Sequence, residues 1–301
     1  MIVTGGILWK EANMRQRLIS AAFGVPLIAA VLLLYNTVVL NIVVALISLL
    51  ALYEVFVAMK YIQSRGLAAA CFIYTAVLPF FNISRMHLIV MTCSYLFIVA
   101  LFSLLMHYRA GLKLEQIGAA SMLTVMISLA FSSIVFLRDI LSVHAYTSFD
   151  SFFYLALIFI GAWITDAGAY FVGRFLGRHK MAPQISPKKT VEGAVGGVAC
   201  SAALFPVAGL VYQNYAASLH IGVTVNYPLL VVMGVLCALA AIFGDLAASI
   251  IKRECQIKDF GHILPGHGGI MDRFDSVMFV APLMYVLVQV VHLVSAGVIP
   301  V

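Results

Sequence analysis

Nine long apolar stretches dominate this sequence of 301 residues. A helix needs roughly 20 residues to cross about 30 Å of hydrocarbon, and it satisfies its own peptide groups there. Hydrophobic residues make up 63% of the chain and charged residues only 10%, so a water-soluble fold could not bury its apolar surface. We therefore expect an all-α, polytopic membrane protein with about nine transmembrane helices. The stretches are 18–35, 37–59, 67–82, 88–106, 118–137, 152–173, 191–213, 228–251 and 277–297.

The basic residues between these stretches predict the orientation. If the N-terminus is cytoplasmic, 16 of the 18 lysines and arginines fall in cytoplasmic segments, and only Arg85 and Arg138 fall outside. This asymmetry is the one that the positive-inside rule requires. Topology thus accounts for the net charge of +6, and we expect no nucleic-acid partner. The first stretch has no small-residue cleavage site after it, which predicts a retained helix and not a signal peptide.

Charge also divides the chain into two parts. Residues 166–275 hold 16 of the 30 Asp, Glu, Lys and Arg residues, whereas residues 1–150 are mainly apolar. We expect residues 1–150 to form a scaffold of transmembrane helices with a possible role in lipid access. Residues 151–301 are expected to form the catalytic membrane domain.

Two acidic residues, Asp166 and Asp245, lie inside apolar stretches. A charge at the centre of a span costs about 2.5–3.5 kcal/mol, so such a residue faces a partner or a water-filled cavity. Asp166, Tyr170 and Arg174 share one helix face, and so do Asp245, Ser249 and Lys252. Two polar stripes that lead to the same side indicate a polar cavity open to the cytoplasm. The alternatives are a buried salt bridge, or two unrelated surface stripes.

A basic segment precedes the stretch 191–213. It reads Gly173-Arg-Phe-Leu-Gly-Arg-His-Lys and then Ser186-Pro-Lys-Lys-Thr-Val-Glu-Gly. Lys188 and Lys189 beside the free amides of a helix start suit phosphate oxygens. Topological anchoring, or attraction to anionic lipid headgroups, is the alternative. The glycines that follow indicate close helix packing and not a nucleotide loop; they are Gly193, Gly196 and Gly197.

The segment 249–275 is more specific. It holds four cations, two histidines, four glycines and a proline, and Asp272 and Asp275 are three residues apart. Those carboxylates can point to one side of a helical turn, and Asp245 could supply a third. Clustered carboxylates repel unless a cation lies between them, and hard oxygen ligands favour Mg²⁺. We expect His262 and His267 to donate hydrogen bonds and not to bind zinc. The pattern favours metal-assisted phosphoryl or nucleotidyl transfer at a membrane surface.

At these residues the sequence resembles a known family. The segment 249–275 is similar to the signature of the phosphatidate cytidylyltransferases, also called CDP-diacylglycerol synthases. The upstream segment from Asp166 to Glu192 also resembles that family, although Arg178 stands where a lysine is expected. The resemblance covers about residues 160–280. The matching signature positions are Ser249, Lys252, Arg253, Lys258, Asp259, Gly261, Pro265, His267, Gly268, Gly269, Asp272, Arg273 and Asp275.

The resemblance implies that CTP and phosphatidate react to give CDP-diacylglycerol and pyrophosphate. It also implies a homodimer among membrane lipids in the bacterial inner membrane, with the active site facing the cytoplasm. Mg²⁺ is the implied cofactor, with K⁺ as a second ion, and Asp245 and Asp272 are the implied metal ligands. The expected catalytic residues are Asp245, Asp272, Asp275, Lys258 and Arg273. The expected substrate-binding residues are Lys188, Lys189, Ser249, Lys252, Arg253, Asp259, His267, Gly268 and Gly269.

The residues agree with that chemistry. The phosphate of phosphatidate is largely ionised at neutral pH, since its second pKa is about 6, so no strong general base is needed. Metal ions and the Lys/Arg set would neutralise the repulsion between two anions. Three rivals stay open: a CDP-alcohol phosphotransferase, whose Asp-Gly…Ala-Arg arrangement is absent here, a transporter for an anionic metabolite, and a CTP-dependent polyprenol or dolichol kinase.

Overall fold

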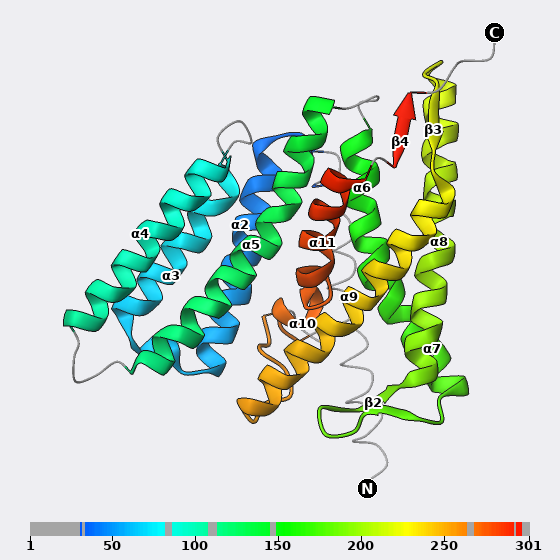
Figure 1. Cartoon of the computed structure of the whole chain (residues 1–301). Helices are drawn as coiled ribbons and strands as arrows, with labels where there is room; N and C mark the ends of the chain where they lie inside the picture. The colour runs from blue at the N-terminus through cyan, green and yellow to red at the C-terminus, as the bar shows by residue number, and fades with distance from the viewer. Residues whose placement is uncertain are drawn as a thin grey trace, which may run out of the picture.

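The computed structural model describes residue 31 and residues 34–81, 86–107, 113–144, 149–263, 268–291 and 293–296. These residues form a bundle of helices (Figure 1). Six helices are long and apolar enough to cross a membrane, and two more are apolar but shorter. The chain is thus a mainly helical, multi-pass membrane protein, as its composition predicts. Eight of the nine predicted stretches coincide with helices, and most of the first, 18–35, lies outside the described residues.

Four helices make up the first half of the bundle. They are α2 (Val38–Ala58), α3 (Arg65–Val77), α4 (Met86–His107) and α5 (Leu114–His144), with short 3₁₀ turns η1 (Tyr61–Gln63) and η2 (Leu78–Phe80). Both α2 and α3 pack against α5, and α4 packs against α3. The buried Arg138 of α5 donates to the carbonyls of Tyr35 and Thr37, at 3.1 and 2.9 Å, and to Asn41 Oδ1 at 3.1 Å. It thereby fixes the start of α2 against α5.

The second half is built on three long spans. The first consists of α6 (Asp150–Phe159), a π-helical turn η4 (Ile160–Ile164) and α7 (Thr165–Leu176). It is followed by α8 (Val191–Ser218) and α9 (Tyr227–Glu254), and α8 packs against both α7 and α9. Thr190 caps α8, since its hydroxyl accepts from the amide of Gly193 at 3.2 Å.

The glycines of α8 serve close packing, as the sequence predicts. A Cβ atom on Gly197 would stand 2.6 Å from the Thr165 carbonyl oxygen, and one on Gly193 would stand 2.6 Å from that of Ala169. A Cβ on Gly196 would overlap the side chain of Val172. The backbones of α7 and α8 therefore approach too closely for any larger residue.

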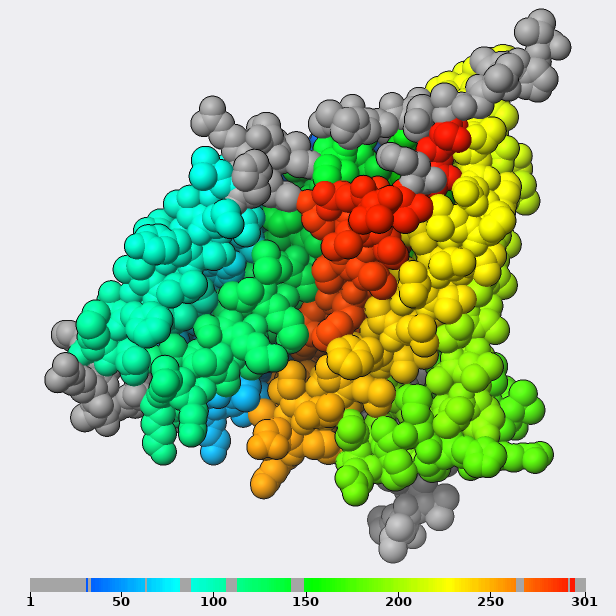
Figure 2. All heavy atoms as spheres, viewed as in Figure 1, coloured from blue at the N-terminus to red at the C-terminus, as the bar shows by residue number. Residues whose placement is uncertain are grey.

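The chain ends with α10 (Met271–Phe274) and α11 (Val277–Val290). α11 packs against α5 of the first half and α9 of the second, and Figure 2 shows it in red between them. The expected helix to residue 297 is wrong at its end. The helix stops at Val290, because β4 (Val294–Ala296) turns back and pairs antiparallel with β3 (Val223–Val225).

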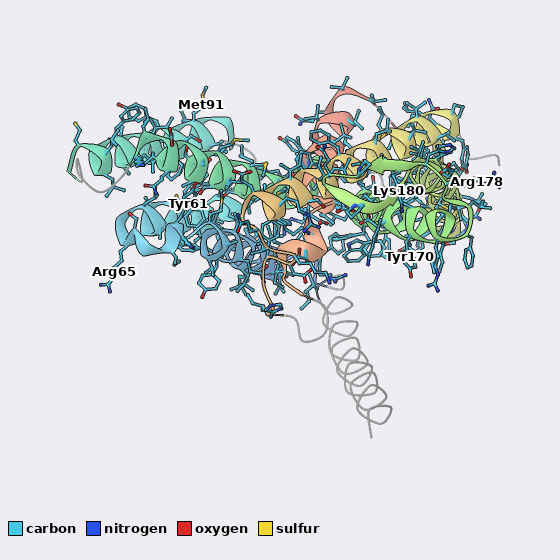
Figure 3. All side chains as sticks on the ribbon, turned by 90° about the horizontal axis from the view of Figure 1, so that it is seen from below. Tyr61, Arg65, Met91, Tyr170, Arg178 and Lys180 are labelled. Carbon is cyan, nitrogen blue, oxygen red and sulfur yellow. The ribbon has the colours of Figure 1, made fainter. Side chains whose placement is uncertain are left out.

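A second antiparallel hairpin joins α7 to α8. It consists of β1 (Lys180–Ala182) and β2 (Ser186–Thr190). This hairpin and α10 lie at one end of the bundle, and β3 and β4 lie at the other (Figure 1). Figure 3 looks at the hairpin end, with Arg65 of the first half on the opposite side of the molecule from Arg178 and Lys180. The orientation of the bundle in the membrane stays a prediction.

Candidate functional site

A cavity of about 290 Å³ lies between α7, α8, α9 and the β1–β2 hairpin. Asp166, Tyr170 and Arg174 all line it, as their shared helix face predicts, and the Arg174 guanidinium donates to the Tyr170 hydroxyl at 2.9 Å. Asp245 reaches the cavity from α9, while Ser249 and Lys252 of the second predicted stripe do not line it. The first stripe therefore lines the cavity along its length, whereas the second stripe reaches it only at Asp245.

Two lysines of β2 also line this cavity. Lys188 is exposed, whereas the Lys189 ammonium forms an ion pair with the carboxylate of Asp245. The backbone brings them there because the hairpin turns the chain back onto the start of α8. The cavity thus presents cations next to a carboxylate, a lining suited to a phosphate anion with a counter-ion.

A further acidic residue, Asp275, lies near Asp166 and Asp245 of the cavity. Asp275 lies between α10 and α11, is only 7% exposed, and accepts a hydrogen bond from its neighbour's amide, Ser276 N, at 2.8 Å. The Ser276 hydroxyl donates to Asp166 Oδ2 at 2.7 Å, so the start of α11 is joined to α7. Burial raises the pKa of Asp275 to about 7, and the charges of Asp245 and Asp166 add to the rise while Lys252 opposes it. These acids are therefore close enough to repel one another.

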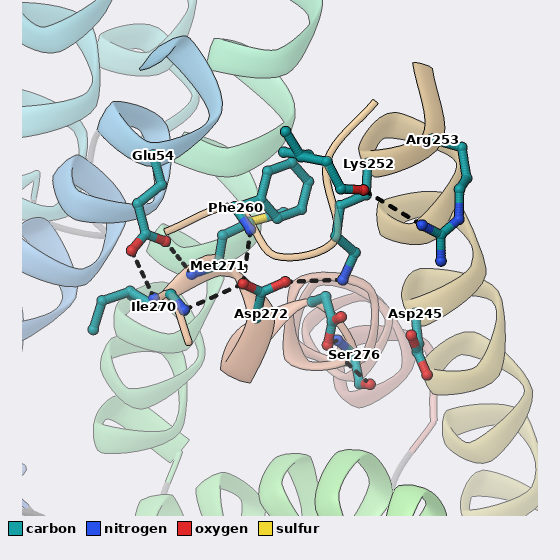
Figure 4. Close-up of polar contacts among 12 residues, drawn as sticks. Glu54, Asp245, Lys252, Arg253, Phe260, Ile270, Met271, Asp272 and Ser276 are labelled. Carbon is teal, nitrogen blue, oxygen red and sulfur yellow. Dashed lines mark hydrogen bonds and ion pairs between the residues drawn. The ribbon is translucent and has the colours of Figure 1, made fainter. Parts of the chain in front are cut away.

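Asp272, on α10, organises the loop before it (Figure 4). Its Oδ1 accepts from the Lys252 ammonium at 2.9 Å. Its Oδ2 accepts from the amides of Phe260 and Gly269, at 2.9 and 3.2 Å. The Asp272 and Lys252 side chains are only 6% and 13% exposed. Asp272 thus joins the end of α9 to both sides of the loop that leads to α10.

Glu54 of α2 is a polar residue of this region that sequence reasoning missed. It is 2% exposed, and its two carboxylate oxygens accept from the amides of Ile270 and Met271, at 3.0 and 2.9 Å (Figure 4). The signal was available, because Glu54 is an acid inside an apolar stretch, just as Asp166 and Asp245 are. Its distance in sequence from the charged segments gives no sign that it belongs to the same region.

The other predicted residues differ in burial and in contacts. Ser249 is buried on α9, while Lys258, Asp259 and Arg273 are exposed on or beside the loop. Arg253 donates to the carbonyl of Ile185 at 3.1 Å, so it ties α9 to the β1–β2 hairpin. Gly268 has a φ of +84°, a backbone conformation that favours glycine. His267 lies outside the described residues.

The donor chemistry of the site suits a hard divalent cation. Its acids are carboxylates, the ligands that Mg²⁺ prefers in company with substrate phosphate. Among the described residues, no group of three or more His, Cys, Asp or Glu side chains has the spacing of a preformed metal centre. Asp245 and Asp272 each have a lysine partner, Lys189 and Lys252, with which a cation would compete. Their assignment to Mg²⁺ stays a prediction.

Comparison with known proteins identifies the family of this chain. The model of the cytidylyltransferase family matches residues 15–291. A phosphatidate cytidylyltransferase of Staphylococcus haemolyticus is 43% identical over 141 residues, 47% of this chain and 51% of the relative. Those of Staphylococcus epidermidis and Staphylococcus aureus are 47% identical over 134 residues (44% and 48% covered) and 42% identical over 141 residues (47% and 51% covered). The chain spans about half the length of these curated relatives. Because the family model covers most of the sequence, the chain belongs to the cytidylyltransferase family.

Proposed function

We propose that this protein is a phosphatidate cytidylyltransferase, which converts CTP and phosphatidate to CDP-diacylglycerol and pyrophosphate. The observation that carries the proposal is the cavity at one end of an apolar bundle, lined by Lys188, Lys189, Asp166 and Asp245. Family membership narrows the chemistry to cytidylyl transfer, and the named relatives support phosphatidate as the acceptor.

In this reaction a phosphate oxygen of phosphatidate attacks the α-phosphorus of CTP. A new P–O bond forms there, and the bond to the β-phosphate breaks, so pyrophosphate leaves with the electron pair. The attacking phosphate is largely ionised at neutral pH, because its second pKa is about 6. The protein's task is therefore to bring two anions together and to stabilise the charge of the transition state.

The cations of the site suit that task. Lys188, Lys189 and Arg174 line the cavity, and their positive charge would offset the repulsion between the phosphates. Lys252 serves mainly to hold Asp272, and Arg253 to hold the hairpin. Lys258 and Arg273 are exposed beside α10, where they could meet the outer phosphates of CTP. The site residues thus include both direct phosphate partners and residues that arrange the backbone.

We assign Mg²⁺ to this site, held by Asp245 and Asp272, with Asp275 adjacent and K⁺ as a second ion. When bound, Mg²⁺ supplies positive charge to the phosphate oxygens of CTP. The oxygen chemistry of these two carboxylates supports this assignment, because Mg²⁺ prefers carboxylates in company with substrate phosphate, and Asp245 lines the cavity beside Lys188 and Lys189.

The same proposal places the protein in a bacterial inner membrane as a homodimer, with the site facing the cytoplasm. The division of lysines and arginines, with 16 of 18 in the segments expected on the cytoplasmic side, supports this orientation. The division into residues 1–150 as scaffold and 151–301 as catalytic domain is part of it. α11, from the second part, packs on α5 of the first, so the two parts share a contact.

The test is synthesis in detergent from labelled CTP and phosphatidate, with and without Mg²⁺. We expect Mg²⁺-dependent CDP-diacylglycerol and an equal amount of pyrophosphate. Asp245→Asn should abolish both products, while Glu115→Gln, at an exposed site on α5, should leave them unchanged. In a parallel reaction with polyprenol in place of phosphatidate, phosphorylated polyprenol with release of CDP would indicate a lipid kinase instead. Solute uptake into vesicles without lipid turnover would indicate a transporter, and either result overturns the proposal.

A further inference from the structure

We infer that Glu54 is a positioning residue for the reaction, and that it holds Asp272 in place from the first half of the bundle. The inference rests on the proposed function. It concerns the loop of residues 255–270, which joins α9 to α10 and which we call the α9–α10 loop. Glu54 belongs to α2, more than 200 residues earlier in the chain, and contacts the end of this loop from the opposite side to Lys252 (Figure 4).

The hydrogen bonds of Glu54 fix the two residues before Asp272. Its carboxylate accepts from Ile270 N at 3.0 Å and from Met271 N at 2.9 Å. These amides stand at the start of α10, where no preceding helical turn supplies an acceptor. Because both bonds end on adjacent residues, they restrain the direction in which α10 begins. The position of the Asp272 side chain follows from that direction.

Two glycines show how closely the α9–α10 loop surrounds Glu54. A Cβ atom on Gly261 would stand 2.3 Å from Glu54 Oε1, and one on Gly269 would stand 2.5 Å from Oε2. These glycines lie on either side of the loop's centre, as do Phe260 and Gly269, whose amides bind Asp272. The carboxylates of Glu54 and Asp272 thus both contact the two sides of the α9–α10 loop. Glu54 reaches the loop from α2, whereas Asp272 follows the loop directly in sequence.

A buried carboxylate in α2 lowers the stability of the protein, so its presence there indicates a role. Glu54 is 2% exposed, and burying a charge is unfavourable unless hydrogen bonds compensate it. Its negative charge also lies near that of Asp272. An apolar residue would fill the same volume in α2 without these penalties, but it could not accept hydrogen bonds from the amides of Ile270 and Met271. Glu54 therefore serves to place α10, although its burial lowers the stability of α2.

The experiment compares Glu54→Ala and Glu54→Gln with Ser48→Ala. Ser48 is a matched control, because it is also buried on α2 but donates only to the Val44 carbonyl of its own helix, at 2.7 Å. Turnover, the KM for CTP and the Mg²⁺ concentration for half-maximal rate are measured in detergent. Protein stability is followed by thermal unfolding of the same samples.

A spectroscopic readout reports on α10 without relying on activity. The Trp163 indole donates to the Arg273 carbonyl at 3.4 Å and lies against Phe274, with ring centroids 6.2 Å apart. The chain has two tryptophans, so Trp9→Phe leaves Trp163 as the only source of indole emission. Each variant is made in this background, and its emission maximum is compared with that of the parent.

We expect Glu54→Ala to lower kcat by about a hundredfold, as displacement of reacting groups by about 1 Å does. Glu54→Gln keeps one acceptor oxygen and should lose about tenfold, which corresponds to 1.36 kcal/mol of barrier. Both should raise the Mg²⁺ requirement and shift Trp163 emission. Ser48→Ala should change neither, even if its melting temperature falls.

Wild-type kcat and Mg²⁺ requirement in Glu54→Gln, or unchanged Trp163 emission in a folded Glu54 variant, overturns the inference. If Glu54→Ala does not fold, the Gln variant decides between the outcomes, because it preserves the shape of the side chain. Failure of the proposed function is distinguishable. In that case the parent protein makes no CDP-diacylglycerol, while the emission shift still reports whether Glu54 positions α10.

Discussion

Replacement of Asp272 tests two roles of one side chain. As the proposed metal ligand it would contribute charge, and as a loop residue it accepts three hydrogen bonds, from Lys252, Phe260 and Gly269. Asp272→Ala removes both roles. In Asp272→Asn the side-chain oxygen can still accept from the amides of Phe260 and Gly269, which preserves the conformation of the loop. This variant loses only the negative charge and the ion pair with Lys252.

The size of the effect follows from burial. The Lys252 side chain is 13% exposed, so loss of its partner leaves a charge that water reaches poorly. Breaking such a pair by removing one member costs about 3–5 kcal/mol of unfolding free energy. We expect Asp272→Ala to fall in this range. Adding Lys252→Met removes the stranded charge, so the double variant should recover most of the about 3–5 kcal/mol that the single variant loses.

The assay is unfolding of the four proteins of this cycle in mixed micelles, together with CDP-diacylglycerol synthesis by each. Additive stability effects, with no recovery in the double variant, would refute the assigned ion pair. For the chemistry, both Asp272→Ala and Asp272→Asn should be inactive. Full activity in the Asn variant would show that Asp272 serves the loop alone and holds no metal.

Two further predictions follow from the fold. Gly197→Ala should destabilise the protein by about 1–3 kcal/mol, because its Cβ would stand 2.6 Å from the Thr165 carbonyl oxygen; an unchanged melting temperature would show that α7 and α8 are not held at this distance. Lys113→Ala, at an exposed position beside α5, should retain wild-type synthesis. A complete loss there would mean that the site extends to the start of α5.

The features that the sequence predicted are local. Apolar length places the spans, and the helical repeat places Asp166, Tyr170 and Arg174 on one face of the cavity. Closely spaced glycines predict that α8 approaches a neighbour, and the neighbour is α7. Each of these inferences depends on residues within a few turns of one another, for which backbone geometry is enough.

The missed features are contacts between distant segments. Glu54 meets Ile270 across a separation of 216 residues, and no periodicity relates them. Arg253, for which phosphate binding stays a prediction, donates to the carbonyl of Ile185 on the hairpin, a contact that its local sequence does not predict. A charged side chain can serve a substrate or a backbone carbonyl equally well, so only the position of the neighbouring loop decides between them.

The π-helical turn at 160–164 lets this span hold one extra residue without a change in the face that Asp166 presents. An α-helix turns by about 100° per residue, whereas the wider π turn uses one more residue to make about the same rotation. Loss of one residue there would return the turn to α-helix and leave Asp166 directed at Ser276, whereas the same loss between this turn and Asp166 would rotate Asp166 away. When relatives are aligned, a gap inside this turn therefore leaves the cavity side of the helix as it is, and a gap elsewhere in the same helix changes it.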